Sequence, residues 1–165
     1  MRAALAALAL ALTLLAGCTP GGSVDPDQAA AELAARPPIA EATRTLLEVQ
    51  DAMARAVSAA SGGLEFLPSR ELRTGSCAGP LADLDGQQTS LASLLADRAV
   101  HDSWPAVLDA ARGVAAANGF TDVVVKVDRP QDHQVRFVAA DGAYLDLGTK
   151  VTTLVGGVTG CHPQS

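Results

Sequence analysis

The amino-terminal segment of this chain has the pattern of a leader that precedes the folded part. Arg2 is followed by an uncharged, almost wholly apolar run over residues 3–15, and two small residues then precede Cys18. The run is shorter than the roughly 20 residues that a helix needs to cross a bilayer core. A positive start and a short apolar stretch that ends in small residues are typical of a secretory signal peptide. We therefore expect residues 1–17 to be removed.

Leu15-Ala16-Gly17-Cys18 resembles the lipobox of bacterial lipoproteins. The resemblance implies that a diacylglycerol is attached to the thiol of Cys18 and that the chain is cut just before this residue. Two or more acyl chains anchor a protein stably, at about 0.8 kcal/mol per buried methylene. Cys18 is thus the expected lipidation site, and membrane lipid the expected partner, on the extracytoplasmic face of the cell membrane. The alternative is an ordinary signal peptide with a chance cysteine.

Cys77 and Cys161 are the other two cysteines of the chain. Lipidation would consume Cys18 and leave an even pair in an oxidising compartment, where thiols commonly pair. We therefore predict a disulfide between Cys77 and Cys161. Because it would close a long loop, it would contribute about 4–5 kcal/mol at most in the chain-entropy model. A reactive thiol is the alternative, but the chain has no CxxC motif.

Composition limits the class of protein that follows the leader. Of the 165 residues, 48% are hydrophobic, an ordinary share for a globular protein, and the length suits one domain behind a leader. The 18 acidic residues outnumber the 12 Lys and Arg, which gives a formal charge of -6. This balance argues against nucleic acid as a partner, because a basic face is needed to release counterions from phosphates.

Residues 18–27 are rich in Pro, Gly, Ser and Asp and have no periodicity, so we expect a flexible tether. Residues 28–165 then form a single domain. Asp27 is placed to cap a short helix over residues 28–36. The Pro37-Pro38 pair must end this helix, because proline lacks the amide donor and restricts the residue before it.

Two longer segments have the period of a helix. Residues 38–61 carry apolar side chains at spacings of three and four, and Gly62 follows the segment. Residues 101–119 form the second, and Asn118-Gly119 supplies a left-handed end. The apolar stripe expected on the first helix consists of Ile39, Ala42, Leu46, Val49, Met53, Ala56 and Ala60.

Strand patterns occupy most of the remaining chain. Residues 64–73 alternate at first and contain Pro68, which predicts an edge strand or a bulged strand. Residues 87–100 are ambiguous, because the spacing of their leucines also suits a helix. A meander of four further strands is predicted over residues 123–127, 133–139, 143–148 and 151–158.

The alternation of apolar and charged residues selects one register for the hairpin near residue 140. A two-residue turn at Asp141-Gly142 would set Phe137 opposite Asp146. A three-residue loop over 140–142 instead sets Phe137 opposite Leu145, Val135 opposite Leu147 and Arg136 opposite Asp146. The second register keeps apolar side chains on one face and charges on the other, with Gly142 in the left-handed position.

These elements predict an α+β fold, in which two main helices pack on one face of an antiparallel sheet of about five or six strands. The layout resembles the LppA-like lipoproteins of mycobacteria and related high-GC bacteria. The resemblance rests on short stretches of sequence: LAGC (15–18), RPPIAEATRTLLE (36–48), GSC (75–77), SWPAVLDAARGVAAANG (103–119), DHQVRF (132–137), GTKV (148–151) and GVTGC (157–161).

The resemblance implies a lipid-anchored envelope protein, a strand rather than a helix at residues 87–98, and pairing of Cys77 with Cys161. It carries over no catalytic residue.

Candidate metal and phosphate motifs are incomplete. The three histidines, His101, His133 and His162, fall in different predicted loops or strand ends, and no HExxH spacing occurs, so we expect exposed loop histidines. Residues 83–86 (DLDG) begin like a calcium loop but lack the later ligands, which favours a turn. Residues 148–150 (GTK) lack the upstream glycine of a phosphate loop. We expect no metal and no cofactor.

Acid–base residues gather only near the turn at 129–132. Asp128, Asp132 and His133 are close in sequence, but a hairpin would place them at an exposed tip, where desolvation cannot tune a pKa. Ser103 beside His101 is better explained as a helix cap. We therefore predict no catalytic residue.

The sequence favours a non-enzymatic binding or accessory module. The alternatives are an envelope hydrolase acting on lipid, peptide or glycan, and a structural spacer near the membrane.

Overall fold

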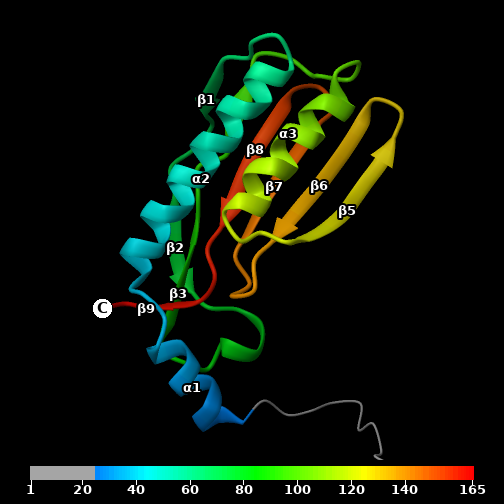
Figure 1. Ribbon diagram of the computed structural model, residues 1–165. Helices are drawn as coiled ribbons and strands as arrows, with labels where there is room; N and C mark the ends of the chain where they lie inside the picture. The colour runs from blue at the N-terminus through cyan, green and yellow to red at the C-terminus, as the bar shows by residue number, and fades with distance from the viewer. Residues whose placement is uncertain (1–24) are drawn as a thin grey trace, which may run out of the picture.

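The computed structural model describes residues 25–165 and consists of helices packed against a single large sheet (Figure 1). The expected signal peptide (1–17) and the expected lipidation site Cys18 lie outside the described residues, as does the tether up to residue 24. The helices are α1 (Pro26–Ala34), α2 (Ile39–Ala60) and α3 (Trp104–Ala117), with the 3-10 turn η1 (Gly79–Leu81). The strands are β1 (Phe66–Pro68), β2 (Arg73–Ser76), β3 (Gly86–Ser90), β4 (Leu94–Ala96), β5 (Asp122–Arg129), β6 (Asp132–Val138), β7 (Tyr144–Thr149), β8 (Thr153–Val158) and β9 (His162–Pro163).

The predicted fold class is confirmed, because α2 and α3 cover one face of an antiparallel sheet. The sheet has nine strands rather than five or six, because the segment over 87–100 is divided into β3 and β4 and because β2 and β9 are additional strands. Its main path runs β1-β4-β8-β7-β6-β5, and β3 pairs with β2, β8 and β9. In the part of the chain that the structure describes, no helix is both long enough and apolar enough to span a membrane.

Both main helices form where the sequence predicts them, whereas the short one begins earlier. Asp25, not Asp27, caps α1: its Oδ1 accepts from the Asp27 amide at 3.0 Å. Pro26 occupies the first turn, where its missing amide hydrogen costs nothing. At the end of α3, Gly119 takes a φ of 84° and the Phe120 amide donates back to the Ala115 carbonyl at 3.0 Å.

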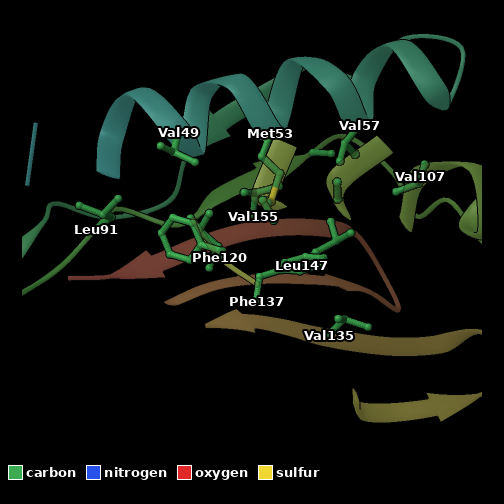
Figure 2. Close-up of a cluster of buried hydrophobic side chains, with 14 of the residues drawn as sticks. Val49, Met53, Val57, Leu91, Val107, Phe120, Val135, Phe137, Leu147 and Val155 are labelled. Atoms are coloured by element: carbon green, nitrogen blue, oxygen red, sulfur yellow. The ribbon is translucent and has the colours of Figure 1, made fainter. Parts of the chain in front are cut away.

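The core lies between α2, α3 and the inner face of the sheet (Figure 2). Met53, Val57, Val107 and Phe137 are fully buried there. The buried stripe of α2 differs from the predicted one, because the predicted Ala42, Ala56 and Ala60 are only partly buried. The buried residues are Ile39, Leu46, Val49, Gln50, Met53, Ala54 and Val57.

The hairpin of β6 and β7 has the register argued from the sequence. Phe137 pairs with Leu145, and Arg136 pairs with Asp146. The loop residue Gly142 has a φ of 86°. On the outer face, Arg136 holds the Asp146 carboxylate through Nε and one terminal nitrogen, both at 2.8 Å, and this hydrogen bonding raises the pKa of Arg136 above its ordinary value.

Residues 87–100 are ambiguous by their leucine spacing, and the strand that the family resemblance implies at 87–98 is present but interrupted in its middle. β3 ends at Ser90 and β4 begins at Leu94, and both pair with β8. The buried side chain of Gln50 on α2 enters this break and donates Nε2 to the Ala92 carbonyl at 2.9 Å and to the Val155 carbonyl at 3.1 Å. The side chain therefore satisfies carbonyls beside the interruption.

Of the segment predicted as a strand over 64–73, Phe66–Pro68 forms β1, and Pro68 ends it at the sheet edge. β2 overlaps this segment only at Arg73. Ser76 of β2 leads directly to Cys77.

The predicted disulfide is present: Cys77 and Cys161 are joined with their Cα atoms 5.5 Å apart. Leu33 of α1 is buried against both cysteines, so the bond lies beside the short helix. Gly86 contacts the bond from β3, because a Cβ there would lie 2.5 Å from the Cys161 sulfur. The chain continues into β9, a strand that the sequence pattern did not predict.

Candidate functional site

A pocket of about 400 Å³ opens between the first half of α2 and the turns that follow α3 and β6. Its size is in the range of small-molecule sites, which are typically concave and mainly apolar. Buried side chains from three elements form its floor: Leu46, Val49, Phe120 and Ala143. The polar residues Glu41, Thr45, Asn118, Asp141 and His162 line the rest.

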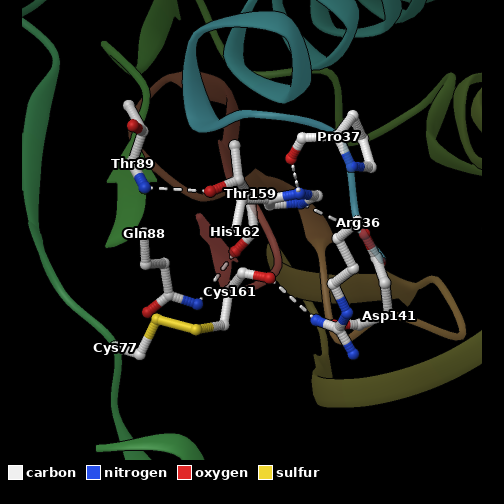
Figure 3. Close-up of a disulfide and its surroundings, with 9 residues drawn as sticks. All are labelled: Arg36, Pro37, Cys77, Gln88, Thr89, Asp141, Thr159, Cys161 and His162. Carbon is white, nitrogen blue, oxygen red and sulfur yellow. Dashed lines mark hydrogen bonds and ion pairs between the residues drawn. A yellow bond between two sulfur atoms is a disulfide. The ribbon is translucent and has the colours of Figure 1, made fainter. Parts of the chain in front are cut away.

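One wall of the pocket is a cluster that joins three distant parts of the chain (Figure 3). Arg36, just after α1, donates one terminal nitrogen to the Asp141 carbonyl at 3.1 Å and to the Cys161 carbonyl at 2.9 Å. His162 of β9 follows the disulfide and is 4% exposed. This wall is therefore fixed by the disulfide and by Arg36.

His162 uses both ring nitrogens within the wall. Nδ1 lies 3.0 Å from the Pro37 carbonyl, and because a carbonyl only accepts, Nδ1 carries a proton. Nε2 lies 3.5 Å from Oδ2 of Asp141, whose Oδ1 accepts from the Ala143 amide at 2.9 Å. The ring is thus fixed by its bond to the Pro37 carbonyl, and the Asp141 carboxylate lies beside its second nitrogen at the pocket.

Hydrogen-bond acceptors predominate among the polar groups of the pocket. Glu41 and Asp141 contribute carboxylates. Asn118 donates one amide hydrogen to the Val114 carbonyl at 2.8 Å, and its side-chain oxygen is a further acceptor. An apolar floor beside such acceptors fits a molecule with an apolar body and a cationic or donor-rich head.

The acid–base residues predicted near residue 130 lie away from this pocket. His133 Nδ1 is 2.9 Å from Asp128 Oδ1, and its ring stacks on Trp104 of α3 with centroids 5.0 Å apart. Asp132 instead bonds Arg129 at 2.6 Å and Lys150 at 3.3 Å. The hydrogen bond from Arg129 is the main reason why the pKa of Asp132 lies below its ordinary value. The predicted Asp–His proximity is present at the hairpin tip, outside the pocket.

The other candidate motifs also stay apart. His101 and Ser103 border a separate hollow before α3, where Ser103 is the N-cap residue but its side chain makes no capping bond. Asp83 and Asp85 are exposed, and Lys150 lies at the end of β7. Among residues 25–165, no three His, Cys, Asp or Glu side chains are grouped so as to hold a metal ion.

None of the three histidines is exposed as expected: His101 and His133 are partly buried, and His162 at the pocket is buried. His162 was expected in an exposed loop, and it is buried, because Cys161 beside it is fixed by the disulfide and β9 pairs with β3. The pairing with Asp141 has no local signal in the sequence. The adjacency of His162 to a predicted disulfide cysteine was the available indication of burial.

Fold and site together define a small α+β sandwich, closed by one disulfide, with an apolar pocket next to that bond. Residues 18–164 match the family model of LppA, described as a lipoprotein confined to pathogenic Mycobacterium. The chain therefore belongs to the LppA family of lipoproteins. Among curated proteins, no match was found.

Two solved structures share the fold. LppA from Mycobacterium tuberculosis aligns with a TM-score of 0.58 and 13% identity, over 82% of this chain and 83% of that one. A DUF4853 family protein from Actinomyces odontolyticus aligns with a TM-score of 0.58 and 18% identity, over 78% of this chain and 71% of that one. At these identities the likeness concerns the fold alone.

Proposed function

We propose that this protein is a lipid-anchored binding module of the cell envelope. Acyl chains on Cys18 hold it on the extracytoplasmic face of the membrane, and the pocket beside α2 takes a small amphipathic molecule. The pocket is the observation that carries the binding role, because it combines a buried apolar floor with a wall fixed by a disulfide.

The anchor is supported by the sequence and by the family. The stretch Leu15–Cys18 has the lipobox pattern, and the family that includes residues 18–164 is one of lipoproteins. A short apolar run before Cys18 suits export rather than a membrane span.

The preferred ligand follows from the charges at the pocket. Glu41 and Asp141 favour a cationic or donor-rich head and repel an anionic one. Arg36, the cation of the wall, already donates to two carbonyls. A single apolar chain that ends in an ammonium group is the simplest molecule of this kind.

Two matched probes test the binding role: octylammonium and octanoate, which share a chain and differ in head charge. Amide NMR shifts of the exported Cys18→Ser chain report binding, and we expect saturable shifts at Gly119 and Asp141 with octylammonium. Octanoate should bind several-fold more weakly, because both carboxylates repel it. Glu41→Gln should reduce the difference in affinity between octylammonium and octanoate. Glu48 is exposed on α2 and lies outside the pocket, so Glu48→Gln should leave this difference unchanged.

A blocking variant provides the control for the site. Ala42 lines the pocket, so Ala42→Trp should abolish the octylammonium shifts. Ala116 is exposed on α3 and outside the pocket, so Ala116→Trp should leave them unchanged. Equal binding of both probes, or binding that survives Ala42→Trp, would overturn the pocket assignment.

A further inference from the structure

β5 is an edge strand with an apolar surface. It pairs with β6 on one side, and no strand of the described chain pairs with its other side. Val123 is 43% exposed, Val124 43% and Val125 56%. In Figure 1, β5 lies at the margin of the sheet, beyond α2 and α3. An exposed edge of this kind offers unpaired amides and carbonyls to another strand.

The other free edges of the sheet are protected by their sequences. β1 has three residues and ends in Pro68, which cannot donate an amide hydrogen. β2 has four residues, none of them with an apolar side chain, and β9 has two residues and ends in Pro163. β5 has eight residues, and its three consecutive valines precede a bulge between Val125 and Val127, so its first half is the edge suited to adding a strand.

The charges of β5 select a second copy of the same strand as its partner. A continuous sheet across a two-fold axis requires that residues opposite each other share a face, so the possible registers differ in steps of two residues. β5 has a bulge between Val125 and Val127, and Lys126 is its extra residue. Counted along the chain with the axis at Val124, Asp122 of one copy lies opposite Lys126 of the other, twice, and Val123 faces Val125. An axis at Val123 would place Asp122 opposite Val124, and an axis at Val125 would place Lys126 opposite Val124. Neither of these registers pairs the two charges.

Neither charge is used within one copy. Among the ion pairs of residues 25–165, Asp122 and Lys126 take part in none. A lysine in an edge strand normally opposes pairing. Here a matching carboxylate lies four residues away, at the position that a two-fold axis at Val124 brings opposite the lysine. Opposite charges directly across a strand pair stabilise the pair.

We propose that two copies of this protein associate through β5, in an antiparallel pair centred on Val124, so that their sheets join into one. The pair covers the exposed valines of both copies and forms two Asp122–Lys126 ion pairs. This association depends neither on the ligand of the pocket nor on the lipid anchor.

A single cysteine at the centre of the pair tests the register in cells that export the full chain. In Val124→Cys, the two copies bring identical residues about 4.5–5.5 Å apart between Cα atoms, which is a disulfide distance. We expect a covalent dimer on a non-reducing gel. In the matched Val127→Cys variant the two cysteines lie about 20 Å apart in this register, and we expect monomer only.

Charge exchange tests the recognition. In the Val124→Cys background, Asp122→Lys and Lys126→Asp should each reduce the dimer yield several-fold, and the two changes together should restore it. The proposal is overturned if Val124→Cys stays monomeric, if Val127→Cys forms as much dimer, if the cross-linked partner has the mass of another protein, or if the exchanged pair fails to recover.

Discussion

Gln50 is the side chain that meets the break between β3 and β4. A helix residue that is 1% exposed is normally apolar, yet here an amide donates to two carbonyls on neighbouring strands. The sequence placed this position next to an apolar stripe but gave no sign that a glutamine would be buried there. The burial of Gln50 and the interruption of the strand can be understood only when the helix and the strand are placed next to each other in the fold.

Gln50→Leu should destabilise the protein by about 1–3 kcal/mol, because the Ala92 and Val155 carbonyls lose their donor in a buried place. Urea unfolding followed by circular dichroism measures the change. Gln28→Leu, at an exposed position of α1, is the control and should change stability by about 0.5 kcal/mol or less. Equal effects of the two substitutions would contradict the role given to Gln50.

Substitution by alanine should change the stability of the protein in opposite directions at Gly86 and at Gly113. A methyl group at Gly86 would lie 2.5 Å and 2.8 Å from the two disulfide sulfurs, whereas one at Gly113 on α3 meets nothing within 4 Å. Gly86→Ala should therefore cost about 1–3 kcal/mol. Gly113→Ala should stabilise the protein by up to about 1 kcal/mol. Unfolding midpoints without reductant measure both, and a Gly86→Ala protein as stable as the parent would refute the close packing.

At the scale of elements, the sequence pattern predicts those features that depend on residues close together in the chain. The register of β6 and β7 follows from alternation and one glycine, and it is confirmed pair by pair. β9 and the break before Leu94 depend on contacts with distant segments, Cys77 and Gln50 among them, and no local pattern reveals them. The pocket is missed for the same reason, since its walls come from segments far apart in the sequence.

The β5–β6 hairpin carries a pH dependence through Asp132. Arg129 and Lys150 favour its charged form and lower its pKa, so the contribution to stability is present above the unfolded-state pKa of about 3.9. That contribution is lost as the pH falls through the folded-state value. Carbon-detected NMR titration of Asp132 should give a midpoint below about 3.9, and Arg129→Gln should raise it. An unchanged midpoint in the variant would show that Arg129 is not the cause.

At the scale of the whole molecule, the first helix of the described chain lies beside the disulfide. α1 lies at one end of the structure, with Leu33 buried against the disulfide and Arg36 bonded to Asp141 and Cys161 (Figures 1 and 3). Under the proposed anchor, any force on residue 25 would reach a cross-linked end of the domain. The pocket lies next to the disulfide, and β5 begins at Asp122, two residues after Phe120 of the pocket.

Mass spectrometry of the amino-terminal peptide from native membranes tests the central claim, the lipid anchor, most directly. We expect the processed chain to begin at Cys18 and to carry the mass of a diacylglyceryl group on that residue, and we expect Cys18→Ala either to leave the membrane fraction or to keep its leader. A mature protein with an unmodified Cys18, or a Cys18→Ala protein that is still labelled with lipid, would contradict the account.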